Sequence, residues 1–215
     1  RTDGRRWHVQ GYGLQARGLN DAEPPHTDIA GMAADYVRHV RRLQPQGPYY
    51  LGGYCYGAVI AHEMARQLEA EGEHVNLLAV LEGYAVEREE ARRELWRPQA
   101  MARFVRNLPH WLRDQLHPAG PYGRRLPWGS PPPDADEAKA CLTEFDLSRR
   151  RLKLAEDEAM AGYRPGVYGG RVTLFRVRTM SLFRADDPLM GWSKFAEGGV
   201  TVRMIDGAHY NFLNR

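Results

Sequence analysis

The sequence predicts an α/β protein with a mostly parallel sheet and helices on both faces. Short apolar runs typical of buried strands alternate with amphipathic segments typical of helices. The chain has 215 residues and 43% hydrophobic content, enough for one domain with a full core. The segment Gly53-Tyr54-Cys55-Tyr56-Gly57 has the G-x-S-x-G spacing of a nucleophile elbow, with cysteine in place of serine. Together these observations predict the α/β-hydrolase fold.

Two elements are expected before the elbow. Residues Trp7 to Leu14 have the pattern of a strand. Thr27 and Asp28 can cap a helix that runs to about Gln44. The apolar residues of this segment recur at helical spacing: Ile29, Met32, Ala33, Tyr36, Val37, Val40 and Leu43.

The elbow itself lies between a predicted strand, Pro48 to Gly52, and a predicted helix, Ala58 to Gly72. The two motif glycines allow a sharp bend and leave room for the helix to pack close to the strand. Because the nucleophile would lie at a helix N-terminus, the local partial positive charge favours thiolate over thiol. The alternative is a chance match, with Cys55 as a small buried hydrophobic residue.

After the elbow, residues His74 to Leu81 form an apolar run that predicts a buried strand ending at Glu82. From position 84 to 150 the sequence turns charged and then rich in proline and glycine, which predicts an insertion, most simply a helical lid. Three further elements complete the pattern: a helix near Lys153 to Tyr163, a strand from Arg171 to Val177 and a last strand from Val200 to Ile205.

Composition excludes several classes. The net charge is +3, and no basic run interleaved with aromatics predicts nucleic-acid binding; the largely arginine surface suits acidic partners better. Cys55 and Cys141 form neither a disulfide framework nor a C-x-x-C metal pair, which indicates a reducing, cytoplasmic compartment. No signal peptide or membrane-length apolar run is present. His62-Glu63 lacks the second histidine of a zinc motif, so no metal is expected.

The best candidate for the catalytic base is His209. α/β-hydrolases place their residues in the chain order nucleophile, acid, histidine. His209 follows the final predicted strand through the loop Asp206-Gly207-Ala208, which would put it above the sheet's C-terminal edge. His62, inside the elbow helix, is expected to pack or face solvent, and His110 and His117 fall in the lid.

Two positions compete for the acid. Glu82 ends the strand after the elbow helix, at the sheet edge where ligands gather in such folds. Asp186 and Asp187 follow the later strand, and both choices satisfy the chain order. Acidic residues at strand ends are often only caps or turn formers, so spacing leaves the choice open.

The chain resembles the C-terminal (type I) thioesterase domain of nonribosomal peptide synthetases. The similarity is carried by Tyr12 to Leu19, Pro25-His26-Thr27, Gln44 to Gly53, Phe104 to Leu112 and Asp187 to Trp192. It implies one thioesterase domain over 1–215, excised from a larger synthetase, and it puts the acid on Glu82, with Asp187 in reserve. The family's usual acid is aspartate. The family's N-terminal strand and oxyanion loop do not appear ahead of Arg1, so the backbone N–H of Tyr56 is the one oxyanion donor expected here.

The resemblance also implies an activity. A peptidyl chain would pass from the phosphopantetheine arm of an upstream carrier protein to Cys55 and leave as a ring, by analogy with cysteine variants that close β-lactams or β-lactones. No intrinsic cofactor is expected. The alternatives are an editing or other hydrolytic thioesterase, a dienelactone-hydrolase-like enzyme, and a non-catalytic carrier-docking module. Lid arginines would face the acidic carrier: positions 92, 93, 97, 103, 106 and 113.

Overall fold

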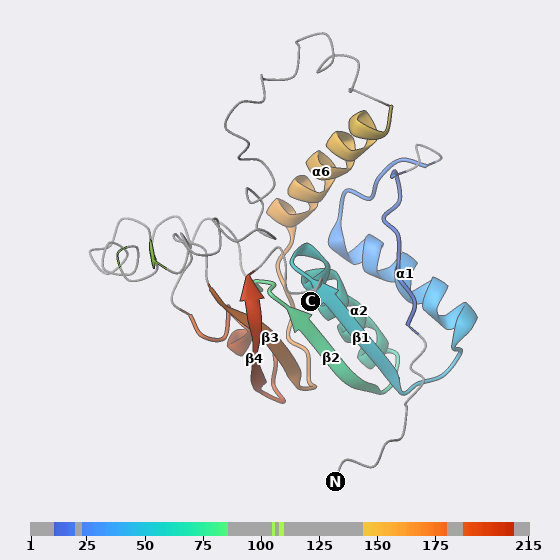
Figure 1. Cartoon of the computed structure of the whole chain (residues 1–215). Coiled ribbons are helices and arrows are strands. Elements are labelled where there is room, and N and C mark those ends of the chain that lie inside the picture. The colour runs from blue at the N-terminus through green and yellow to red at the C-terminus, as the bar shows by residue number, and fades with distance from the viewer. Residues whose placement is uncertain are drawn as a thin grey trace, which may run out of the picture.

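The computed structural model describes residues 11–19, 23–85, 105, 108–109, 144–179 and 187–208. Within these residues the chain forms one parallel sheet in the order β1-β2-β3-β4 (Figure 1). The strands are β1 (Tyr49–Tyr54), β2 (Val75–Leu81), β3 (Val172–Thr179) and β4 (Val200–Ala208). The helices are α1 (Ile29–Leu43), α2 (Tyr56–Ala70), α6 (Glu144–Gly162) and the short 3-10 helix η1 (Trp192–Lys194). The α/β architecture expected from the sequence is confirmed.

Three details differ from the expectations. β4 continues through Ala208, where a loop was expected, because Ala208 pairs with Thr179 at the end of β3. α6 begins at Glu144, earlier than expected, so it includes the last residues of the expected lid. The lid residues from 86 to 143 lie outside the described residues, apart from 105 and 108–109. Of the strand expected over Trp7 to Leu14, residues 7–10 lie outside the described residues, and residues 11–14 are not in a strand. Gly11 and Gly13 suit a strand poorly, and Tyr12 is 62% exposed.

Helix α1 begins where the sequence places its cap. The Asp28 carboxylate accepts a hydrogen bond from the backbone N–H of Gly31 (2.6 Å), which satisfies one donor of the first turn. The buried side chains Ile29, Met32 and Val37 then join the core. The apolar stripe of α1 therefore packs against the rest of the domain, as its periodicity predicts.

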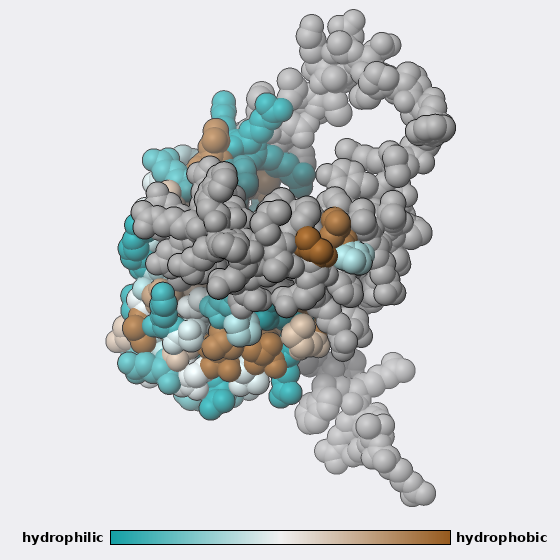
Figure 2. Space-filling view, turned by 90° about the vertical axis from the view of Figure 1, so that its left-hand side faces the viewer, coloured by the Kyte–Doolittle hydropathy of each residue, from teal (hydrophilic) through white to brown (hydrophobic). Residues whose placement is uncertain are grey.

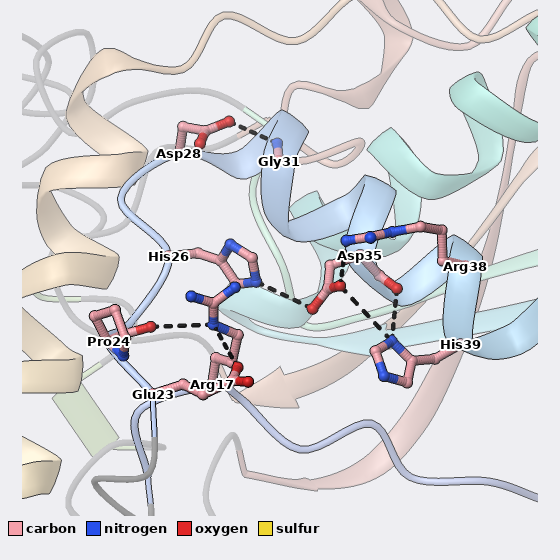
Figure 3. A network of polar contacts seen from close by, with 9 residues as sticks. All are labelled: Arg17, Glu23, Pro24, His26, Asp28, Gly31, Asp35, Arg38 and His39. Atoms are coloured by element: carbon pink, nitrogen blue, oxygen red, sulfur yellow. Dashed lines mark hydrogen bonds and ion pairs between the residues drawn. The ribbon is translucent and has the colours of Figure 1, made fainter.

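A network around Asp35 attaches the segment before α1 to that helix (Figure 3). Asp35 is 9% exposed, and its carboxylate accepts hydrogen bonds from His26 Nε2 (3.3 Å) and from the Arg38 guanidinium. His39 Nδ1 donates to the Asp35 carbonyl oxygen (2.8 Å). Earlier in the segment, Arg17 contacts both Glu23 and the Pro24 carbonyl. A buried carboxylate is costly unless it is hydrogen-bonded, and His26 and Arg38 supply the hydrogen bonds that Asp35 needs.

The two faces of the sheet differ in burial. Tyr49, Leu51, Leu78, Val80 and Leu174 are buried in the same core cluster as residues of α1 and α2. Residues that alternate with them are more open, and Tyr50 is 66% exposed. At β4, the last strand of the described sheet, Met204 is 53% exposed; Figure 2 shows this side of the molecule, with apolar surface among hydrophilic residues.

The C-terminal end of α6 is fixed to α2. Glu63 is 4% exposed, and its carboxylate accepts hydrogen bonds from the Tyr163 hydroxyl (2.6 Å) and from Arg66 Nε (3.0 Å). Farther along α2, the Glu69 carboxylate accepts from the Gly169 N–H (2.9 Å). The chain that returns from the lid region is therefore held on the elbow helix. None of the described helices is long and apolar enough to cross a membrane.

Candidate active site

Cys55 occupies the tight turn between β1 and α2. Its backbone has φ 52° and ψ −113°, a left-handed φ that residues other than glycine rarely adopt. The Cys55 N–H donates to the Leu81 carbonyl (2.9 Å), and the Cys55 carbonyl accepts from the Ala58 N–H (3.2 Å). Such a conformation costs about 1–3 kcal/mol and persists only where the surroundings enforce it. The turn has the strained strand-to-helix form that a nucleophile elbow requires.

Close packing around the turn depends on two glycines, of which the sequence motif contains one. A Cβ on Gly53 would lie 2.0 Å from the Gly57 carbonyl oxygen, so the first motif glycine is required. A Cβ on Gly57 would meet no described atom within 4 Å, so the second is not required by these contacts. A Cβ on Gly83 would lie 2.3 Å from the Ala58 Cβ and 2.7 Å from the Cys55 oxygen. The requirement at Gly83 was not predicted, since it arises between the end of β2 and the elbow turn with its helix α2, which are distant in the sequence.

Glu82 lies beside the elbow at the C-terminal edge of the sheet. Tyr54 pairs with Leu81 in the β1–β2 register, so Cys55 and Glu82 follow immediately after paired residues. Glu82 is 3% exposed and has a left-handed φ of 50°. Its N–H donates to the Phe175 carbonyl (3.0 Å), and its Oε1 accepts from the Val177 N–H (2.7 Å). The carboxylate is thus buried and oriented by β3, at the same edge as the cysteine.

Asp187, the other candidate acid, has a different set of contacts. One of its oxygens accepts from the Leu189 N–H (2.8 Å) and the other from the Gly191 N–H. The turn that it stabilises leads to Trp192, whose indole N–H donates to the Gly83 carbonyl (2.7 Å). The geometry therefore gives Asp187 a turn-stabilising role that supports the residue next to Glu82.

The remaining candidates divide between described and undescribed positions. His209 and Asp186 lie outside the described residues, as do His110, His117 and the six lid arginines. Tyr56 is the first residue of α2, where a backbone N–H has no partner inside the helix and can point to a developing oxyanion.

His62 is a core residue. Its side chain is fully buried, its ring centroid lies 5.0 Å from that of Trp192, and its Nε2 donates to the Phe195 carbonyl (3.0 Å). Burial lowers its pKa. Among the residues that the structure describes, no cluster of histidine, cysteine or acidic side chains could hold a metal ion.

A family model for the thioesterase domain matches residues 4–215. The chain belongs to the thioesterase domain family. It is 30% identical over 203 residues to malpinin synthetase from Mortierella alpina; that match covers 92% of this chain and 2% of the synthetase. A second relative, the dimodular nonribosomal peptide synthase of Bacillus subtilis, is 45% identical over 73 residues, covering 34% of this chain and 3% of the synthase. The matches to this chain therefore span only 2% and 3% of the lengths of these two curated relatives.

Two solved structures are similar to this thioesterase over most of its length. One is the NocB thioesterase domain in covalent complex with a fluorophosphonate nocardicin G analogue: 26% identity, TM-score 0.57, covering 94% of this chain and 74% of that one. The other is AB3403, a four-domain nonribosomal peptide synthetase: 25% identity, TM-score 0.64, covering 94% of this chain and 16% of that one. Nonribosomal peptide synthetase thioesterase domains thus share the fold described here.

Proposed function

We propose that this thioesterase releases a peptidyl chain from a carrier protein through an acyl-Cys55 intermediate, with His209 as general base and Glu82 as the acid that orients it. Residues 1–215 would form one domain of a larger synthetase, with a lid over about 84–150. The single observation that carries the proposal is the elbow: Cys55 has the strained turn of a nucleophile and lies next to a buried, oriented carboxylate.

The acylation step needs no cofactor. Cys55 Sγ, deprotonated by His209, attacks the thioester carbonyl carbon of the peptidyl-phosphopantetheine. A carbon–sulfur bond forms, the carrier's carbon–sulfur bond breaks, and the carrier thiol leaves with the proton returned by His209. The Tyr56 N–H would donate to the tetrahedral oxyanion. Covalent modification of the NocB domain by a fluorophosphonate supports a covalent route in this fold.

Cysteine affects the second step. An acyl-cysteine is a thioester, so the activation carried by the phosphopantetheine arm is retained, whereas an acyl-serine would be a lower-energy oxoester. A nucleophile within the peptide attacks the acyl carbon, His209 accepts its proton, and the Cys55 thiolate leaves. We therefore propose that the product is cyclic and that strained rings such as β-lactams or β-lactones are within reach. Attack by water instead would give the hydrolytic alternative.

The test is chemical labelling followed by product analysis. In the wild-type protein a chloromethyl ketone or β-lactone probe should label Cys55 stoichiometrically. A non-catalytic docking module does not need a reactive cysteine, so it predicts no such labelling. In Cys55→Ala the rate of peptidyl release from the carrier should fall by about 10⁴-fold or more, because the covalent route disappears. Mass spectrometry of product released from a loaded upstream carrier would then separate ring from free acid.

The matched variant is Cys55→Ser. It should still accept acyl groups but shift the outcome toward stalled ester or free acid, because the ester intermediate is less activated. If the serine variant forms ring as fast as the wild type, the energetic reason for cysteine is wrong even though the covalent route stands.

A further inference from the structure

Helix α6 carries a carboxylate on the side that packs against the domain. Leu152 and Ala159 are 8% and 3% exposed, and Met160 and Tyr163 pack against the core. Glu156 falls four residues after Leu152 and three before Ala159, which puts it on this same inward stripe of α6, and it is half-buried. Acidic residues are rarely placed on such a stripe unless they are paired or functional.

Two tyrosines from other helices belong to the same region. Tyr36 of α1 is 9% exposed and shares its core cluster with Ala159, and Tyr56 of α2 packs against that cluster. The Tyr56 hydroxyl is buried and has no hydrogen-bond partner among the residues that the structure describes. Because Tyr56 follows Cys55 directly, this unsatisfied hydroxyl belongs to the residue next to the nucleophile. In Figure 1, α6 lies at the end of the sheet where β1 gives way to α2.

No described cation is paired with Glu156. Lys153, one turn earlier, forms its ion pair with Asp157 (2.6 Å). Burial raises the pKa of the Glu156 carboxyl, and Lys153 only partly offsets this. Burial raises the pKa of both Tyr36 and Tyr56, and nearby carboxylates raise it further: Asp35 and then Glu156 for Tyr36, and Glu156 and then Asp157 for Tyr56. Glu156 thus acts on both phenols with a negative charge that Lys153 offsets only in part.

We propose that Glu156, with the hydroxyls of Tyr36 and Tyr56, forms a subsite beside Cys55 that binds an ammonium group of the acyl chain. A protonated amine would supply the missing charge to Glu156 and would donate hydrogen bonds to the carboxylate and to the unsatisfied Tyr56 oxygen. The subsite rests on the proposed function only in assuming that acyl chains reach Cys55. It would select acyl chains that bear a basic side chain or a free amine.

The experiment compares thioesters that differ only in charge. The probes are the N-acetylcysteamine thioesters of 6-aminohexanoic and 8-aminooctanoic acid, each against its uncharged isostere, the heptanoyl or nonanoyl thioester. Equilibrium binding is measured in a Cys55→Ala background, where no acylation can occur, and the rate of Cys55 acylation is measured by intact mass with Cys55 present. The quantity of interest is the ratio of amine to isostere, which cancels general effects on folding.

With Glu156 intact, at least one amine probe should bind more tightly than its isostere. Glu156→Gln should reduce the amine-to-isostere ratio by about tenfold to a hundredfold, as expected for loss of a charged hydrogen-bond partner, and Tyr56→Phe should reduce it less. The matched control is Glu158→Gln, the same substitution at an exposed carboxylate on the same helix, which should leave the ratio unchanged. Equal ratios with and without Glu156, or an equal reduction in Glu158→Gln, would overturn the subsite. Retained binding preference without acylation of Cys55 would overturn the proposed function instead.

Discussion

At the scale of single residues, the two candidate acids differ in what their oxygens contact. Glu82 is buried at the end of β2, and Val177 holds one of its oxygens. Both oxygens of Asp187 accept backbone N–H groups within its own turn. A triad acid must stabilise an imidazolium, which favours the carboxylate beside the elbow over the one that holds a turn.

Replacing each acid by its amide tests this assignment. Glu82→Gln keeps the shape of the side chain but removes its charge, so kcat for acyl release should fall by about 10³–10⁴-fold. Asp187→Asn keeps one acceptor for the turn, so it should cost about 1–2 kcal/mol of stability and lower kcat by less than about tenfold. Steady-state kinetics and urea unfolding on both variants measure the two effects. A larger kcat loss in Asp187→Asn would move the acid to the later loop.

At the scale of elements, the strand–turn–helix unit depends on how closely α2 approaches β2. Because Gly83 has no side chain, the Ala58 Cβ of α2 can approach the end of β2 closely. A Cβ on Gly57, by contrast, would meet no described atom within 4 Å. Gly83→Ala should therefore push the elbow helix away and cost about 1–3 kcal/mol, with a matching loss of Cys55 labelling rate. Gly57→Ala, a change of the same size in the first turn of α2, should stabilise the fold by about 0.5–1 kcal/mol because alanine suits a helix better. Equal destabilisation of both variants would refute this explanation of Gly83.

The elements were predictable to the extent that their signals are local. The Asp28 cap, the periodicity of α1 and the apolar runs of β1 and β2 depend on neighbouring residues, and the structure places those elements within a few positions of the expected ones. The extension of β4 to Ala208 depends on pairing with β3, and the requirement at Gly83 depends on contact with α2. Such distant contacts leave no periodic trace in one sequence. The significance of Glu156 was not predicted either, because the tyrosines near it come from α1 and α2, which are distant in the sequence.

At the scale of the whole molecule, α2 connects the candidate site to the rest of the fold. Cys55 precedes its first turn, Glu63 in its middle holds the end of α6 through Tyr163, and His62 packs against Trp192. Trp192 in turn donates to the carbonyl of Gly83, next to Glu82. A change in the protonation of His62 would therefore act on packing that supports the site.

His62 should make the stability of the fold sensitive to mild acid. Its folded-state pKa is lowered by burial, so below about pH 6.5, the ordinary histidine pKa, the unfolded chain takes up a proton that the folded chain resists. The contribution of neutral His62 is thus fully present above that pH and is lost as the pH falls, at up to about 1.4 kcal/mol per pH unit. His62→Gln keeps a donor for the Phe195 carbonyl but cannot be protonated, so in urea unfolding the stability difference between wild type and variant should stay nearly constant from pH 7.5 to about 6.5 and then narrow toward pH 5.5. His39→Gln, at a 53% exposed side chain, serves as the control. A wild-type–His62→Gln difference that stays constant over this range would mean that the buried ring is protonated as easily in the folded chain as in the unfolded one.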